Sequence, residues 1–480
     1  MFLTQEIIKS FAVPSLCRCL TGEREDLRKL LVLEKTPFTS PVLRAFLARL
    51  SKDLGQGGGV LGNLLLRVGR LANPTARKRL VRNVIFHWAV RGAALRTRIR
   101  NSGRWVPYFV AMSPTMRCNL GCRGCYSALY SKQGELSEEE LDRLFGECKA
   151  MGDYFVVITG GEPFLLKDSL LRLFRKHKDM YFLVFTNGTL LDEPLAKALA
   201  RLGNVAPALS LEGFEAETDR RRGRGVYRQV TRSMRLLRAY GVLFGISVTY
   251  TSENLETVTD DRFIESMLDL GILFAWYFMF VPVGKDPILE LVPAPEQRVH
   301  CGKRVVELRR KYGVFLADFW NDGPAVGGCL AGARRYLHVL NSGRAEACVF
   351  AHFGVDNIRE KSLLDAANSP FFNAIREAFP YNASANLRRP CIITDNPQVL
   401  RKLVNEHVTA KGHPHSEDIV RDPAVTCWID DYARRFEALT EPEWRRTIED
   451  PGSRWYKEKA EYLNLFKLGK RGADGRWQAG

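Results

Sequence analysis

The chain has 480 residues, of which 46% are hydrophobic and 26% are charged. This composition is typical of a globular protein and excludes extensive disorder or a coiled coil; the length predicts two to four domains of about 100 to 200 residues each. There are 71 Lys and Arg against 54 Asp and Glu, a net charge of +17, which favours anionic partners. The eleven cysteines are an odd number and too few for a disulfide scaffold, so they indicate metal ligation in a reducing cytoplasm.

Residues 1–105 are predicted to form a basic helical region. The stretch from Arg67 to Arg104 holds eleven Lys or Arg and no acidic residue. Its apolar residues recur at helical spacing, which predicts a basic amphipathic helix; they are Val81, Val84, Ile85, Trp88, Leu95 and Ile99. Two interpretations stay open: the helix lies on an anionic membrane surface, or its apolar stripe packs on the protein while the arginines face solvent.

The sequence shows no run of the ~20 apolar residues that a membrane-spanning helix needs, and no signal peptide is recognisable. We therefore expect a cytoplasmic protein. It would be peripheral to the membrane if residues 67–104 bind lipid.

Residues 106–284 alternate short apolar runs with helical periods. The predicted strands are 108–112, 154–159, 181–186, 206–211, 242–250 and 274–281, and the predicted helices are 137–151, 168–178, 191–202, 227–240 and 261–270. Repeated strand–helix units predict parallel strands with right-handed crossovers. Six units are too few for an eight-fold closed barrel, so we expect a partial barrel or an open sheet, with its site at the carboxyl ends of the strands.

Residues 285–400 lose this alternation and gain cysteines. Tyr336–Leu340 and Glu346–Phe350 flank Asn341-Ser342-Gly343, which predicts a β-hairpin with a glycine-containing turn. Residues 401–480 are predicted to form a helical, charged tail.

The strongest chemical signal is the segment Cys118-Asn119-Leu120-Gly121-Cys122-Arg123-Gly124-Cys125. It places three thiols within eight residues, directly after the first predicted strand. A structural zinc ion would need a fourth ligand from a remote part of the chain, and this alternative stays open. Iron–sulfur clusters are commonly held by cysteine thiolates, and three cysteines on a cubane would leave one iron open to a small molecule.

This segment resembles the signature of the radical S-adenosylmethionine (radical SAM) superfamily. The resemblance extends to loops after the next three strands: Gly160-Gly161-Glu162-Pro163, Thr186-Asn187-Gly188 and Ser210-Leu211-Glu212-Gly213. Members often carry an aromatic residue before the third cysteine, where this chain has Gly124, with Tyr126 directly after Cys125.

The resemblance implies a partial (β/α)6 barrel of the radical SAM type. It implies that Cys118, Cys122 and Cys125 hold a [4Fe–4S] cluster whose open iron chelates SAM. The residues it implies for SAM binding are Gly160, Gly161, Glu162, Pro163, Thr186, Asn187, Ser210, Glu212 and Tyr126. Among them, the Glu162 carboxylate is expected to accept hydrogen bonds from the methionine ammonium of SAM.

A second group of cysteines, Cys329, Cys348 and Cys391, lies in residues 285–400. The stretch from Gly343 to Cys348 resembles the hairpin of the auxiliary-cluster extension called SPASM, or of its shorter form, twitch. The resemblance implies one auxiliary iron–sulfur cluster. Its fourth ligand stays open between Asp395, His352, Cys427 and an iron left free for substrate. The alternative is three ordinary buried thiols.

As a radical SAM enzyme, the protein would take an electron from a reduced flavodoxin- or ferredoxin-type donor and cleave SAM reductively. The resulting 5′-deoxyadenosyl radical would abstract hydrogen from a substrate, for which we expect a peptide or protein side chain. The alternatives are a lipid or lipid-linked substrate at the membrane surface, and a scaffold that binds SAM without cleaving it. The charge alone permits nucleic acid, but no aromatic-rich binding motif supports it.

Overall fold

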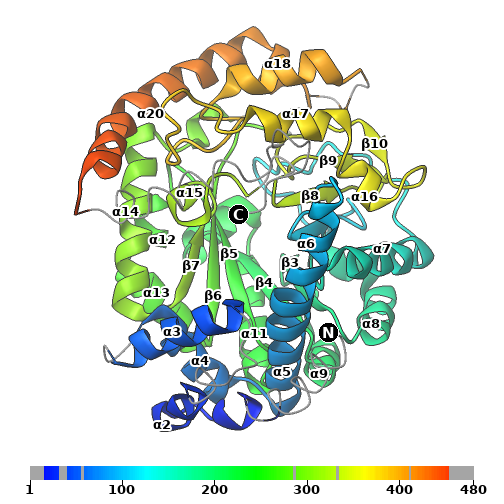
Figure 1. Cartoon of the computed structure of the whole chain (residues 1–480), viewed down its shortest axis with the longest axis vertical. Coiled ribbons are helices and arrows are strands. Elements are labelled where there is room, and N and C mark those ends of the chain that lie inside the picture. The colour runs from blue at the N-terminus through cyan, green and yellow to red at the C-terminus, as the bar shows by residue number, and fades with distance from the viewer. Residues whose placement is uncertain are drawn as a thin grey trace.

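The computed structural model describes residues 14, 16–31, 41–55, 59–284, 288–330, 334–409, 412–413 and 415–452. Its centre is a sheet with the strand order β10-β9-β8-β1-β2-β3-β4-β5-β6-β7, surrounded by helices (Figure 1). The strands are β1 (Phe109–Met112), β2 (Phe155–Ile158), β3 (Tyr181–Thr186), β4 (Val205–Leu211), β5 (Gly245–Tyr250), β6 (Phe274–Met279), β7 (Phe315–Asp318), β8 (Tyr336–Val339), β9 (Arg344–Glu346) and β10 (Asp356–Asn357).

Strands β1 to β7 pair in parallel in chain order, and β8 pairs in parallel with β1. The six predicted strands correspond to β1–β6, so the expected parallel α/β core is confirmed. The predicted hairpin is also present, since β8 and β9 pair antiparallel around Gly343. The sequence did not indicate β7, nor the pairing of β8 with the far edge of the core.

Helices follow most strands, as predicted. In the core they are α7 (Glu138–Met151), α8 (Lys167–Lys176), α9 (Glu193–Leu202), α10 (Glu215–Arg222), α11 (Val226–Ala239), α12 (Leu255–Val258) and α13 (Asp261–Leu270). A capping box formed by Ser137 and Glu140 starts α7. Later helices are α14 (Pro295–Tyr312), α15 (Gly323–Val326), α16 (Leu363–Ala366), α17 (Pro370–Ala378), α18 (Pro397–His407), α19 (Asp418–Arg421) and α20 (Pro423–Glu449).

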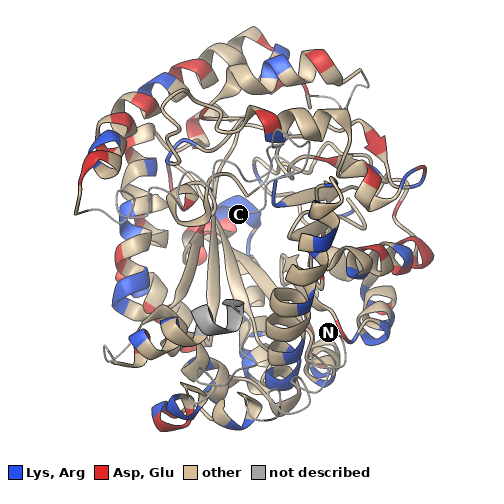
Figure 2. Cartoon of the chain, viewed as in Figure 1, with Lys and Arg blue, Asp and Glu red and all other residues tan. Residues whose placement is uncertain are grey.

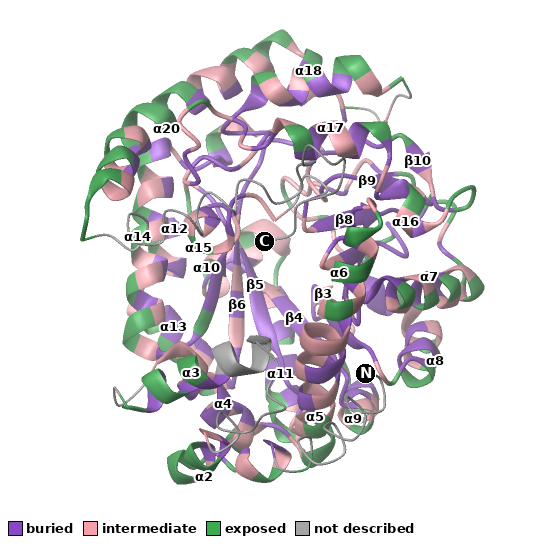
Figure 3. Cartoon of the chain, viewed as in Figure 1, coloured by how far each residue is buried: buried purple, intermediate pink, exposed green. Residues whose placement is uncertain are grey.

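None of the strands β1–β6 contains a charged residue, and they are drawn without red or blue in Figure 2. Because both faces of a parallel sheet are covered, such strands are apolar throughout. Figure 3 shows them mostly buried, with the exposed residues on the outer sides of the helices. One hydrophobic cluster runs from Val106 in the core to Trp444 in α20, so the C-terminal helices share the core of the barrel.

The N-terminal helices are α2 (Arg24–Arg28), α3 (Pro41–Gly55), α4 (Val60–Leu71), α5 (Pro74–Arg79), the π-helix η2 (Leu80–Gly92) and α6 (Ala93–Asn101). Figure 1 shows α3, α4 and α5 at the lower ends of the strands, opposite α17, α18 and α20. We call residues 60–101 the floor segment, because it crosses the amino-terminal ends of the barrel strands one after another.

From Asn63 to Asn83, the contacts of the floor segment follow the reverse order of the strands. Asn63 lies against Gly313, which precedes β7; Val68 and Ala72 pack with Leu243 and Leu273, which precede β5 and β6. The side-chain amide of Asn73 donates to the carbonyls of Ala200 and Tyr240, before β4 and β5, at 3.3 and 3.1 Å. The side-chain amide of Asn83 donates to the carbonyl of Met180, before β3, at 2.8 Å. The Arg96 guanidinium donates to the carbonyl of Gly152, before β2, at 2.6 Å. The Trp88 indole donates to the carbonyl of Tyr108, before β1, at 2.7 Å.

These contacts favour the interpretation that the apolar stripe of residues 67–104 packs on the protein. Trp88 packs on Phe155 with ring centroids 5.8 Å apart, and Val81 is buried. Two of the arginines, Arg96 and Arg100, are buried as well. In the described residues, no helix is long and apolar enough to cross a membrane.

Candidate functional site

The three cysteines of the 118–125 segment line one cavity of about 230 Å³ inside the barrel. The segment follows β1, so its thiols lie at the carboxyl ends of the strands, where sites of parallel α/β folds form. Gly124 has a φ of +64°, and a Cβ there would come within 2.6 Å of the Phe280 ring. Phe280, which follows β6, therefore places its ring where a side chain at position 124, directly before the third cysteine, would lie.

Gly160 and Gly161 bring the loop after β2 against the cysteine segment. A Cβ on Gly160 would fall 2.4 Å from the Thr115 carbonyl oxygen, and one on Gly161 would fall 2.1 Å from that of Arg117. Only glycine permits this approach of two backbones. Both glycines line the cavity.

Glu162 is buried and does not line the cavity. Its carboxylate accepts hydrogen bonds from the backbone N–H groups of Phe164 and Asn187, at 3.0 and 2.7 Å, and from the Thr186 hydroxyl at 2.8 Å. Burial raises the pKa of this carboxyl despite these donors. The carboxylate thus ties the loops after β2 and β3 together, a role that the predicted contact with the SAM ammonium did not include. The adjacent Pro163 also lies outside the cavity lining.

Thr186 and Asn187 line the cavity at the end of β3, and Ser210 lines it at the end of β4. The side-chain nitrogen of Asn187 lies 3.7 Å from the Cys118 sulfur and donates to the side-chain oxygen of Asn119 at 2.8 Å. Tyr126 lines the cavity beside Cys125. Burial raises its pKa to about 12, so it stays a neutral hydroxyl near pH 7.

Glu212 lies behind the cavity wall. Its carboxylate contacts Arg221 at 2.7 Å and Arg222 at 2.5 Å, and these two arginines line the cavity in its place. A terminal nitrogen of Arg222 is 4.0 Å from the Cys122 sulfur. Neither arginine was predicted from the sequence, where the available signal is the run from Arg220 to Arg222 in the last turn of α10. They place positive charge beside thiolates, which suits an anionic cluster or carboxylate ligand.

The second group of cysteines also meets around one cavity, smaller than the first. Cys329, Cys348 and Cys391 come from three segments and line it together with apolar side chains. The amides of Phe350 and Ile393 point at the sulfurs of Cys348 and Cys391, each at 3.4 Å. Amide-to-sulfur hydrogen bonds are a feature of iron–sulfur ligation. Burial raises the pKa of both thiols, that of Cys391 to about 11, and a metal would displace their protons.

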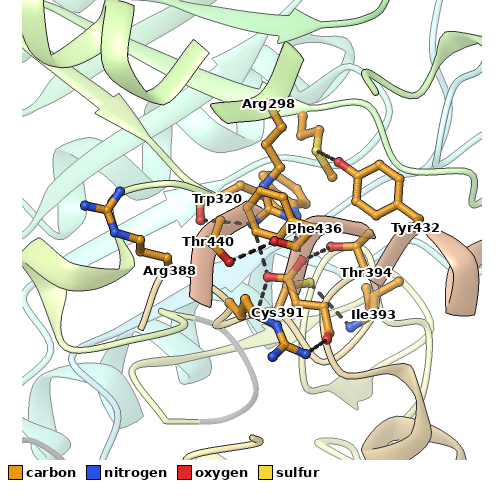
Figure 4. Close-up of polar contacts among 12 residues, drawn as sticks. Arg298, Trp320, Arg388, Cys391, Ile393, Thr394, Tyr432, Phe436 and Thr440 are labelled. Atoms are coloured by element: carbon orange, nitrogen blue, oxygen red, sulfur yellow. Dashed lines mark hydrogen bonds and ion pairs between the residues drawn. The ribbon is translucent and has the colours of Figure 1, made fainter. Parts of the chain in front are cut away.

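None of the three residues considered as a fourth ligand lines this cavity. Asp395 forms a buried ion pair with Arg298, at 2.5 and 3.0 Å, and also accepts the Cys391 amide at 3.0 Å. Figure 4 shows Arg298 beside the Phe436 ring in this network. His352 contacts the Val349 carbonyl and His413, at 3.2 and 2.7 Å, and Cys427 is exposed.

The described residues include no three His, Cys, Asp or Glu side chains arranged around a single metal ion. Each cysteine triad instead surrounds a cavity. An iron–sulfur cluster with a small polar ligand fits the first cavity, where Arg222 and the loop of Gly160 and Gly161 lie beside the three thiols. The second triad of cysteines fits another cluster.

Comparisons with known proteins agree with this geometry. The family model described as the radical SAM superfamily matches residues 112–270. An AdoMet-dependent heme synthase from Oleidesulfovibrio alaskensis is 30% identical over 324 residues, which cover 61% of this chain and 82% of that protein. A PqqA peptide cyclase from Granulibacter bethesdensis is 28% identical over 284 residues, 55% of this chain and 74% of the cyclase.

Among solved structures, SuiB from Streptococcus suis bound to S-adenosylmethionine matches with a TM-score of 0.51 and 17% identity. The match covers 73% of this chain and 84% of SuiB, and it supports the fold. The chain therefore belongs to the radical SAM superfamily of iron–sulfur enzymes, which bind S-adenosylmethionine, and its C-terminal part is consistent with an extension of the SPASM type.

Proposed function

We propose that this protein cleaves SAM reductively and removes a hydrogen atom from a peptide or protein side chain. The observation that carries the proposal is that Cys118, Cys122 and Cys125 share one cavity with the glycine loop after β2 and the polar ends of β3 and β4. When bound there, the [4Fe–4S] cluster and SAM would supply an electron and a primary carbon radical.

The residues around the cavity would have distinct roles. Asn187 would hold the loop of Cys118 in place, since it contacts both that sulfur and Asn119. Arg222 would balance the negative charge of the thiolates. Glu162 is a positioning residue that fixes the loops after β2 and β3, while Phe280 and Tyr126 exclude water from the cysteine segment.

The peptide substrate is supported by the name of one relative, the PqqA peptide cyclase. The heme synthase is about as similar to this chain in sequence as the peptide cyclase is, and its name gives heme rather than a peptide as the product. The lipid alternative loses its main argument, because the apolar stripe of residues 67–104 is used in packing. A reduced flavodoxin- or ferredoxin-type protein is the proposed electron donor, and a net charge of +17 favours an acidic one.

We also propose one auxiliary cluster on Cys329, Cys348 and Cys391, with its fourth iron site free of protein ligands. The support is that Asp395, His352 and Cys427 all lie outside the cavity lining.

The test is anaerobic incubation of the reconstituted protein with SAM and dithionite. We expect 5′-deoxyadenosine from the native chain, and at least a hundredfold less when Cys118, Cys122 and Cys125 are all replaced by alanine. Cys427→Ala is the matched control, because that thiol is exposed and lines neither cavity. Absence of 5′-deoxyadenosine from a native chain with full iron content would contradict the proposal and favour a scaffold that binds SAM without cleaving it.

A further inference from the structure

The inner wall of the barrel is lined by aromatic rings. Alternate residues of a strand face the same side, and on β1, β2, β3 and β6 the inward positions are apolar. Besides Tyr126 and Phe280 near the cysteines, eight aromatic residues line the cavity from the strands and the loops beside them: Phe109, Phe155, Phe185, Trp276, Phe278, Phe319, Tyr336 and Phe350. We call these eight side chains the aromatic belt.

The belt is continuous. Phe109 stacks on Tyr336 with ring centroids 5.2 Å apart, and Trp276 stacks on Phe278 at 6.1 Å. Phe278 in turn lies 5.3 Å from Phe319 and 5.7 Å from Phe185. Phe319 after β7 and Tyr336 of β8 lie 6.4 Å apart, so the rings also meet across the gap in the barrel.

The polar groups of the cavity lie elsewhere on its wall. Ser210, Ser247 and Thr249 line it from β4 and β5, and the charged residues that line it are Arg221 and Arg222. Both arginines contact Glu212, at the end of the barrel that holds the cysteines. The aromatic belt itself holds no Asp, Glu, Lys or Arg.

The cavity reaches the amino-terminal ends of β1 and β2, where Phe109 and Phe155 line it. Trp88 of the floor segment packs on Phe155 from outside the cavity, with ring centroids 5.8 Å apart. At this strand the floor segment therefore lies directly behind the cavity wall.

We infer that the C–H bond broken by this enzyme belongs to an uncharged hydrophobic side chain of a peptide, either aromatic or branched aliphatic. This inference rests on the proposed function and names its substrate class. The hydrogen atom of the side chain ends in 5′-deoxyadenosine, and the side chain is left as a carbon radical. A Glu side chain in the belt would lose its hydration without gaining a partner, which is strongly unfavourable. A Lys ammonium would gain cation–π contacts but would lose its hydration and find no carboxylate there, whereas aromatic and aliphatic groups gain burial and ring contacts without any such cost.

The first experiment follows deuterium. Blocked pentapeptides with one central residue deuterated in its side chain are incubated anaerobically with the reconstituted full chain, SAM and dithionite, and 5′-deoxyadenosine is analysed by mass spectrometry. The central residue is Phe, Leu, Lys or Glu, and vesicles with perdeuterated acyl chains form a further sample. We expect deuterium from the Phe and Leu peptides at a level at least tenfold above that from Lys and Glu.

Deuterium from the Lys or Glu peptides at an equal level, from the acyl chains alone, or from no sample while 5′-deoxyadenosine still forms, would overturn the inference and leave SAM cleavage intact. Failure to form any 5′-deoxyadenosine would overturn the proposed function itself.

The second experiment measures binding without turnover. The ¹⁹F NMR line of N-acetyl-4-fluorophenylalaninamide should broaden in the presence of the native chain and of Phe278→Leu, and at least tenfold less with Phe278→Ser. Leu439→Ser, at an exposed position of α20, should broaden the line as the native chain does. Absence of broadening with the native chain, or displacement of the probe by N-acetyl-lysinamide at the same concentration, would overturn the inference.

Discussion

Replacement of Asp395 by asparagine tests whether this residue supports the auxiliary site or ligates its metal. Asp395 and Arg298 are both fully buried and form two hydrogen bonds. Burial alone would favour a neutral Arg298, but the charge of Asp395 outweighs it and raises the pKa of the guanidinium. Asp395→Asn keeps an acceptor for the Cys391 amide and removes the carboxylate that neutralises the buried charge of Arg298.

Loss of one partner of a buried ion pair costs about 3 to 5 kcal/mol. For a chain of this length, the entropy of unfolding is about 1 kcal/mol per degree, so the melting temperature should fall by about 3 to 5 °C. The double variant Arg298→Met, Asp395→Leu should recover most of this loss, because it removes both charges.

The assay is thermal unfolding of the anaerobic protein, followed by circular dichroism, together with iron analysis of the folded sample. We expect a lower melting temperature at an unchanged iron content. An unchanged melting temperature combined with the loss of about four irons per chain, the content of one [4Fe–4S] cluster, would refute the reasoning and identify Asp395 as a ligand.

Three further predictions concern other parts of the molecule. Cys348→Ala should lower the iron content by about four atoms per chain, whereas Cys427→Ala should not; equal contents would remove the auxiliary cluster. Burial raises the pKa of the Asp318 carboxyl from 3.8 to about 6, so the folded state keeps this proton up to a higher pH than the unfolded state does. The stability of the native chain relative to Asp318→Asn should therefore fall as the pH rises from about 4 to about 6. A difference in melting temperature that stays constant over this range would contradict that assignment. Trp88→Ala should destabilise the protein by about 2 to 4 kcal/mol, measured by thermal unfolding, while a comparable loss in Arg98→Ala, at an exposed position, would argue against packing as the cause.

The parallel core could be predicted because its signals are local. Apolar runs, helical periods and the capping box at Ser137 each depend on residues close together in the chain, and β1–β6 follow the predicted order. The pairing of β8 with β1 could not be predicted, because it joins Tyr336 to Phe109 across more than two hundred residues.

The site was predictable to a similar extent. The cysteines and glycines have fixed spacing, and they meet at one cavity as expected. The contribution of Phe280 depends on the space above Gly124, and that of Arg222 on the turn of α10 toward Glu212. Phe280 leaves no motif in the sequence, and the run from Arg220 to Arg222 does not by itself show which of its arginines reaches the cavity, since both contacts depend on packing between distant segments. For the same reason, the buried state of Glu162 could not be distinguished from a direct contact with SAM.

The arrangement of residues 60–101 has a consequence for synthesis on the ribosome. These residues leave the ribosome early, yet their partners include Gly313, which is made some 250 residues later by the count of the printed sequence. The Asn63 end of the segment must therefore wait until Gly313 has been translated, whereas Trp88 can pack on Phe155 once β2 has been made. A version of the enzyme that begins after residue 105 would expose the apolar underside of the strands, and we expect it to aggregate rather than fold.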